Sequence, residues 1–121
     1  IQQSRTESAL KLSKFFHAVC VLKGVGTICA SFDGSWFMNT TGNPGLASGG
    51  TGDVLSGIIG SLIAQGLNTL DAVKLGVYLH GVAADELLKK GIGPIGMTAS
   101  EVALEARNVL NALNLRTSYS L

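Results

Sequence analysis

One segment of the chain combines the residue types that phosphate chemistry requires. Residues 39–57 read NTTGNPGLASGGTGDVLSG, in which closely spaced glycines precede a single carboxylate, Asp53. Glycine allows positive φ angles and lets a backbone approach a ligand with no Cβ in the way. The amides of such a loop can surround an anion, and Asp53 could accept a proton from a substrate hydroxyl. The segment therefore predicts a phosphate site with an acid-base carboxylate.

A helix is expected directly after these glycines. Apolar residues recur there at spacings of three and four, namely Val54, Leu55, Ile58, Ile59, Leu62 and Ile63. Asp53 would then stand in the first helical turn, where free amides and the helix dipole favour phosphate. This is the arrangement that phosphoryl transfer needs. The same residues also fit a plain glycine-rich turn in which Asp53 only starts the helix, and the spacing alone leaves both interpretations open.

Two common nucleotide motifs are excluded by the spacing. A Walker A loop ends in Gly-Lys-Ser/Thr, and no lysine follows the glycines here. The dinucleotide pattern needs a third glycine where Leu55 stands after Gly50 and Gly52.

A second glycine-containing segment, Lys23–Thr27 (KGVGT), lies between two strand-like runs. Its glycines would let the main chain curve beside a nucleotide, with the Lys23 ammonium or the Thr27 hydroxyl near a phosphate. The residues by themselves favour a simple strand turn with a surface lysine.

We interpret two features of residues 73–90 as structural and not as part of a functional site. His80 shares a helical stripe with apolar residues, so we expect a core-facing histidine bonded to a neighbouring group. Asp85 and Glu86 stand four residues before Lys89 and Lys90, the spacing of a solvated charged face, and no function is inferred from them.

The chain alternates between helix-like and strand-like segments, which predicts an α/β fold. Asp33-Gly34 is typical of a hairpin turn, and Thr98 with Glu101 forms a capping box. Helices are expected at residues 6–16, 52–65, 69–90 and 99–113, and strands at 18–22, 27–31 and 35–39.

Composition limits the class of protein. The 121 residues are 46% hydrophobic, which is enough for one compact core and too few for two domains. A net charge of +1 with 14% charged residues gives no basic field for nucleic acid or membrane. Cys20 and Cys29 lie in apolar runs without a metal-type partner, so we expect two reduced, buried thiols and a cytoplasmic protein with no membrane segment.

Four segments of the chain stand out together, namely Leu22–Thr27, Asn43–Gly45, Gly49–Leu55 and Tyr78–Gly81. Their order and spacing over residues 15–113 resemble those of a known family, the ADP/ATP-dependent NAD(P)H-hydrate dehydratases of the ribokinase-like superfamily. The resemblance implies a three-layer ribokinase-like fold. Residues 1–121 would form a single C-terminal part of that nucleotide-binding domain, with the N-terminal part absent.

The resemblance also implies a site and a reaction. Hydrated NADH or NADPH would be phosphorylated on its ring hydroxyl by ADP or ATP with Mg²⁺, and phosphate would then be eliminated. Asp53 would be the base and would contact the substrate together with Asn43. The nucleotide would bind at Lys23, Gly24, Val25, Gly26, Thr27 and Gly52, and the anion hole would be Gly49, Gly50, Thr51 and Gly52. Mg²⁺ would be held by nucleotide oxygens and water, without dedicated protein ligands.

The resemblance further implies a homo-oligomer and a companion N-terminal segment, without which the sheet would keep an unpaired edge. Two other functions stay open. One is a ribokinase-like kinase for a vitamin-precursor alcohol, whose product would remain phosphorylated. The other is a non-catalytic module that binds adenine nucleotide.

Overall fold

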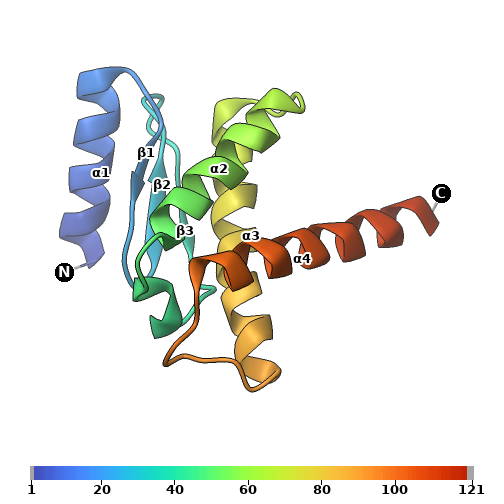
Figure 1. The fold of residues 1–121 in the computed structure, drawn as a ribbon. Helices are drawn as coiled ribbons and strands as arrows, with labels where there is room; N and C mark the ends of the chain where they lie inside the picture. The colour runs from blue at the N-terminus through green and yellow to red at the C-terminus, as the bar shows by residue number, and fades with distance from the viewer. Residues whose placement is uncertain (1, 120–121) are drawn as a thin grey trace. The chain divides into compact units, whose positions relative to one another are not determined.

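A computed structural model describes residues 2–119 as an α/β fold of three strands and four α-helices (Figure 1). The elements in chain order are α1 (Gln2–Phe16), β1 (Cys20–Leu22), β2 (Thr27–Ala30), β3 (Trp36–Asn39), the 3₁₀ helix η1 (Pro44–Ala47), α2 (Thr51–Ala64), α3 (Thr69–Lys89) and α4 (Ala99–Tyr119). They form two compact units, one of Ile1–Thr40 with Ile59–Val77 and one of Thr41–Ile58 with Tyr78–Leu121.

The first unit contains an antiparallel sheet with the strand order β1-β2-β3, and α1 runs along it (Figure 1). Val21 pairs with Cys29, and Cys29 with Phe37. The β2–β3 hairpin forms at the expected turn, where Gly34 has a φ of +94° and the Asp33 carboxylate accepts hydrogen bonds from Ser35. The core of this unit is centred on Ala9, Ile28 and Ala30.

The second unit contains the glycine loop, the start of α2, the second half of α3, and α4. Its core is formed by buried apolar residues of α3, α4 and the segment between them, namely Ala83, Ala84, Leu87, Met97, Val102 and Ala106. Leu46, Val54 and Ile58 pack against this core, so the loop and the first turns of α2 are anchored by ordinary apolar burial.

The expected elements are all present. The helices near 52–65 and 69–90 agree to within one residue, α1 begins four residues earlier than expected, and α4 continues to Tyr119. The capping box is confirmed, because the Thr98 amide donates to Glu101 Oε1 at 2.9 Å and the Glu101 amide donates to Thr98 Oγ1 at 3.2 Å.

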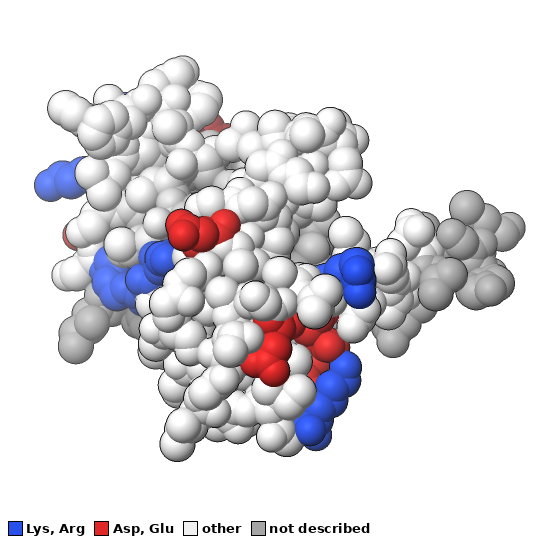
Figure 2. All heavy atoms as spheres, in the orientation of Figure 1, with Lys and Arg blue, Asp and Glu red and all other residues white. Residues whose placement is uncertain are grey.

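Charged side chains are sparse on the face drawn in Figure 2, and neither sign forms an extended field there. This agrees with the low charge of the sequence. Across residues 2–119, none of the helices is long and apolar enough to cross a membrane.

Candidate functional site

The glycines of the loop have different structural roles. Gly42 and Gly50 have φ angles of +108° and +88°, a region that favours glycine. Gly45 is buried and is required for close packing, because a Cβ there would lie 2.7 Å from Met97 Sδ. A Cβ at Gly49 would meet nothing within 4 Å, so the backbone at that position faces open space.

Asp53 stands in the first turn of α2, as expected, and its side chain is exposed. Among the hydrogen bonds described for residues 2–119, none uses the amides of Gly49, Gly50, Gly52 or Asp53 as donors. Four amide donors are therefore open within five residues, next to a solvent-accessible carboxylate. A helix start of this kind favours an anion.

Thr51 has a different role from its glycine neighbours. Its buried hydroxyl lies 2.5 Å from the Leu46 carbonyl oxygen and 2.9 Å from that of Ser48. Its amide donates to the Ser48 carbonyl over a longer distance of 3.4 Å. The Thr51 side chain thus fixes the loop onto α2, and of its polar groups only the weakly bonded amide remains for the predicted anion hole.

The carboxylate of Asp85 on α3 binds the loop, and this corrects the expectation of a solvated charge. Its Oδ2 accepts from the Gly42 amide at 3.0 Å, and its Oδ1 accepts from Asn43 Nδ2 at 3.1 Å. Asn43 in turn accepts from the Gly45 amide at 2.9 Å and caps η1. Asn43, expected to contact substrate, therefore also has a positioning role inside the loop.

The remaining charges of this region form two ion pairs that differ from the expected spacing. Glu86 pairs with Lys89 at 3.0 Å on the surface, while Lys90 pairs with Glu105 of α4 at 2.8 Å. Of the charged face expected on α3, only the Glu86–Lys89 pair lies within the helix.

His80 and Gly81 of α3 contact the two ends of the same loop. His80 is buried and its Nε2 lies 2.9 Å from the Thr51 carbonyl oxygen, which confirms the expected core-facing histidine bonded to backbone. Gly81 packs against Thr41 so closely that a Cβ would lie 2.0 Å from Thr41 Oγ1. A side chain at position 81 would separate α3 from the loop.

The segment Lys23–Thr27 lies between β1 and β2 in the first unit, and Arg5 of α1 binds its carbonyls. Arg5 Nη1 donates to Val25 O at 2.9 Å and Gly26 O at 3.1 Å, and Nη2 donates to Leu22 O at 3.4 Å. Gly24 permits this approach, since a Cβ there would lie 2.9 Å from Arg5 Nη2. The predicted nucleotide segment is therefore a curved turn whose carbonyl groups accept hydrogen bonds from Arg5.

Within this segment the Thr27 hydroxyl donates to the Gly24 carbonyl at 3.1 Å, so it holds the turn closed. Lys23 and Val25 are exposed. The ammonium of Lys23 is therefore accessible to a ligand.

The predicted site residues are divided between the two units. Asn43, Gly49–Gly52 and Asp53 belong to the second unit, while Lys23–Thr27 belongs to the first. Arg5 and Asp85 were missed as positioning residues, because their partners lie 17–21 and 42–43 positions away and no local pattern signals them.

Both cysteines are free, with Cys29 buried and Cys20 half-buried. Burial raises the pKa of Cys29 to about 11, so this thiol stays protonated near neutral pH. In the part of the chain that the structure describes, no group of three or more His, Cys, Asp or Glu side chains could hold a metal ion.

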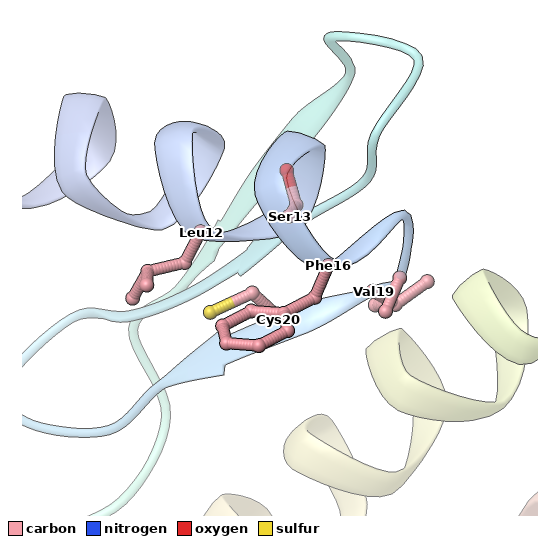
Figure 3. A pocket seen from close by; sticks show the side chains of 6 residues that line it. Leu12, Ser13, Phe16, Val19 and Cys20 are labelled. Atoms are coloured by element: carbon pink, nitrogen blue, oxygen red, sulfur yellow. The ribbon is translucent and has the colours of Figure 1, made fainter.

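A pocket of about 280 Å³ lies beside α1 and β1 in the first unit (Figure 3). Leu12, Phe16, Val19 and Cys20 line it together with Ser13 and Ala18. The lining contains no charged group, so this pocket does not fit a phosphate.

An α/β fold with a glycine loop that opens a helix and a carboxylate in its first turn is characteristic of the ribokinase-like class. The structure of an ADP/ATP-dependent NAD(P)H-hydrate dehydratase from Bacillus subtilis superposes with a TM-score of 0.85 at 34% identity, over 92% of this chain and 41% of that chain. A ribokinase-like superfamily protein from Enterococcus faecalis superposes with a TM-score of 0.65 at 33% identity, over 82% of this chain and 35% of its own. The expected ribokinase-like fold is confirmed.

The chain belongs to the NAD(P)H-hydrate dehydratase family, whose profile matches residues 1–107. It is 43% identical over 113 residues to the ADP-dependent (S)-NAD(P)H-hydrate dehydratase of Neisseria meningitidis, covering 93% of this chain and 38% of that protein. It is 49% identical over 90 residues to a bifunctional NAD(P)H-hydrate repair enzyme of Moorella thermoacetica, covering 74% of this chain and 17% of that protein. The chain thus spans well under half the length of these relatives.

Proposed function

We propose that the protein takes part in ADP- or ATP-dependent dehydration of hydrated NADH or NADPH. The observation that supports this proposal most directly is the helix start at Gly49, Gly50, Gly52 and Asp53. Their amides donate none of the described hydrogen bonds and lie beside the exposed Asp53 carboxylate. Family membership and the names of the relatives support the substrate class.

The proposed reaction has two stages. The ring hydroxyl oxygen forms a bond to the terminal phosphorus of the nucleotide, the bond from that phosphorus to its bridging oxygen breaks, and the hydroxyl proton passes to Asp53. The carbon–oxygen bond of the new ester then breaks, phosphate leaves, and the neighbouring carbon loses a proton. The dihydropyridine ring is thereby restored.

The open amides have a defined part in the first stage. Preorganised N–H donors stabilise negative charge that develops in a transition state, and they need no rearrangement when it forms. We assign this role to Gly49, Gly50 and Gly52, with a smaller part for Thr51, whose amide already donates to Ser48. Asn43 keeps one N–H of its amide for a substrate contact.

The nucleotide is assigned to Lys23, Gly24, Val25, Gly26, Thr27 and Gly52, which agrees with the exposed Lys23 and the curved turn. A related Bacillus subtilis enzyme was crystallised with ATP and Mg²⁺. Mg²⁺ would be held by nucleotide oxygens and water, where it would neutralise phosphate charge.

We further propose that activity requires the rest of the fold found in the relatives, and that the protein acts as a homo-oligomer in the cytoplasm. The coverage of the relatives and the pairing of β1 on one side only, among the described strands, support the first statement. The free thiols support a reducing compartment.

Product analysis tests this function against the closest alternative. The complete polypeptide is incubated with hydrated NADH, Mg²⁺ and ADP or ATP, and the phosphorus-containing products are identified and quantified by ³¹P NMR. We expect free phosphate and NADH in equal amounts. A stable phosphomonoester would instead indicate a ribokinase-like kinase, and nucleotide binding without any turnover would indicate a binding module.

A further inference from the structure

We infer that Asp85 is a positioning residue for the reaction, although it lies on α3 outside the glycine loop. This inference rests on the proposed function, because it concerns the geometry of the same anion site. Through its two oxygens Asp85 fixes residues 42–45, and through them it determines which loop amides remain open for a ligand.

The carboxylate of Asp85 is hydrogen-bonded to the loop. It is half-buried, and neither ion pair found among residues 2–119 includes it. It accepts from the Gly42 amide at 3.0 Å and from the Asn43 side chain at 3.1 Å. Hydrogen bonds to an ionised acceptor are stronger than neutral ones, so these two contacts hold the turn firmly.

The effect of Asp85 reaches α2 through a short series of hydrogen bonds. Asn43 accepts from the Gly45 amide at 2.9 Å, and Gly45 O accepts from the Ser48 amide at 3.2 Å. The carbonyl of Ser48 in turn contacts the Thr51 hydroxyl at 2.9 Å. Thr51 is the first residue of α2, two positions before Asp53.

These bonds divide the loop amides into two sets. The amides of Gly42 and Gly45 donate to the side chains of Asp85 and Asn43. The amides nearer α2, at Gly49, Gly50, Gly52 and Asp53, are left open. Asp85 therefore directs an anion toward the helix start, where Asp53 stands, and away from the first half of the loop.

The test compares Asp85→Asn with a matched control, Glu86→Gln, in the complete polypeptide. Gly42 and Asn43 donate to different oxygens of Asp85, and Asp85→Asn replaces one of these oxygens by an NH2 donor, so one of the two bonds must be lost. Glu86→Gln removes the same charge from the next residue, whose carboxylate pairs with Lys89 at the surface. Steady-state kinetics give kcat and KM for hydrated NADH, and amide hydrogen exchange gives the protection of Gly42 and Gly45.

We expect Asp85→Asn to lower kcat by about 100-fold, as a small misplacement of catalytic groups does, while KM for hydrated NADH changes little. Protection at Gly45 should fall by about 10-fold, and Asn43→Ala should lower kcat similarly. The double variant should be no worse than Asn43→Ala alone, because both changes break the same series of bonds. Glu86→Gln should match wild type.

A kcat within about threefold of wild type in Asp85→Asn would overturn the inference. Equal losses in Glu86→Gln would also overturn it. If Asp85→Asn does not fold, Asp85→Ser decides by the same readouts, because it removes both carboxylate oxygens. If wild-type protein restores no NADH, the proposed function has failed; ADP affinity by calorimetry then decides, and unchanged affinity and Gly45 protection in Asp85→Asn would overturn the positioning role.

Discussion

Arg5 shows how much one residue contributes to the segment Lys23–Thr27. Its guanidinium reaches the carbonyls of Val25 and Gly26 from α1, 20 and 21 residues away in sequence. With these carbonyls turned toward Arg5, the main chain is held curved, and the Thr27 hydroxyl closes the turn on the Gly24 carbonyl. The shape of the proposed nucleotide segment therefore depends on a side chain outside it.

Replacing Arg5 by Met should weaken both the fold and nucleotide binding. Hydrogen bonds to charged groups contribute about 1.5–3 kcal/mol when buried, and this site is partly exposed, so we expect a loss of about 1–2 kcal/mol in urea unfolding. ADP affinity, measured by calorimetry, should fall about 10-fold. Arg5→Lys keeps the charge without the planar guanidinium, so its stability and ADP affinity should lie between those of wild type and Arg5→Met. Wild-type ADP affinity in Arg5→Met would contradict this account.

The placement of the candidate site residues was partly predictable. The position of Asp53 in the first helical turn after the glycines could be predicted from sequence, because these residues are neighbours and form a local pattern. The loop contacts of Asp85 could not be predicted, because its i,i+4 spacing to Lys89 fits a solvated helix face equally well. Only the packing of α3 on the loop separates these two interpretations.

At the scale of elements, α3 is the support of the glycine loop. His80, Gly81 and Asp85 contact its end, its start and its first turn, respectively. The hydrophobic period predicted the helix correctly, because core-facing residues recur along it. It did not predict which polar residues face the loop, since this depends on tertiary packing.

The closeness of α3 and the loop can be tested at Gly81. In Gly81→Ala the new Cβ would lie 2.0 Å from Thr41 Oγ1 and 2.7 Å from its backbone carbon, so α3 or the loop must shift. We expect a destabilisation of about 1–3 kcal/mol in urea unfolding, the usual cost of overpacking. The matched control is Gly57→Ala in α2, where a Cβ meets nothing within 4 Å. It should stabilise by about 0.5–1 kcal/mol; equal effects in the two variants would contradict the packing.

The start of α4 supplies a pH-dependent element. The Thr98 amide and hydroxyl donate to Glu101 Oε1, both at 2.9 Å, and these bonds lower the pKa of Glu101. Because the folded pKa lies below the ordinary value, this stabilisation is present above the ordinary pKa and is lost as pH falls through the folded one. Thermal unfolding at pH 6 and pH 3 should show a larger decrease for wild type than for Glu101→Gln. Equal decreases would contradict the capping box.

At the scale of the whole molecule, the 121-residue chain exposes apolar surface around α1 and β1. Leu12, Phe15 and Phe16 are 45%, 81% and 67% exposed, and the pocket in Figure 3 opens beside them. Within the described residues β1 pairs only with β2, and an unpaired strand edge promotes association.

We therefore expect the isolated chain to self-associate, with a light-scattering mass that rises with concentration. Phe16→Ser should reduce this association, because it removes apolar surface next to the open edge. Ile95→Ser is the control, since Ile95 is 95% exposed but lies between α3 and α4. A monodisperse monomer at all concentrations would count against this expectation.

The central claim concerns Asp53, the exposed carboxylate in the first turn of α2. The most direct measurement is recovery of the reduced-nicotinamide absorbance when the complete polypeptide receives hydrated NADH, Mg²⁺ and ADP or ATP, with Asp53→Asn measured in parallel. The account predicts nucleotide-dependent recovery in wild type, and in Asp53→Asn a rate lower by about 100- to 10,000-fold with nucleotide binding nearly unchanged. Undiminished recovery in Asp53→Asn would contradict it.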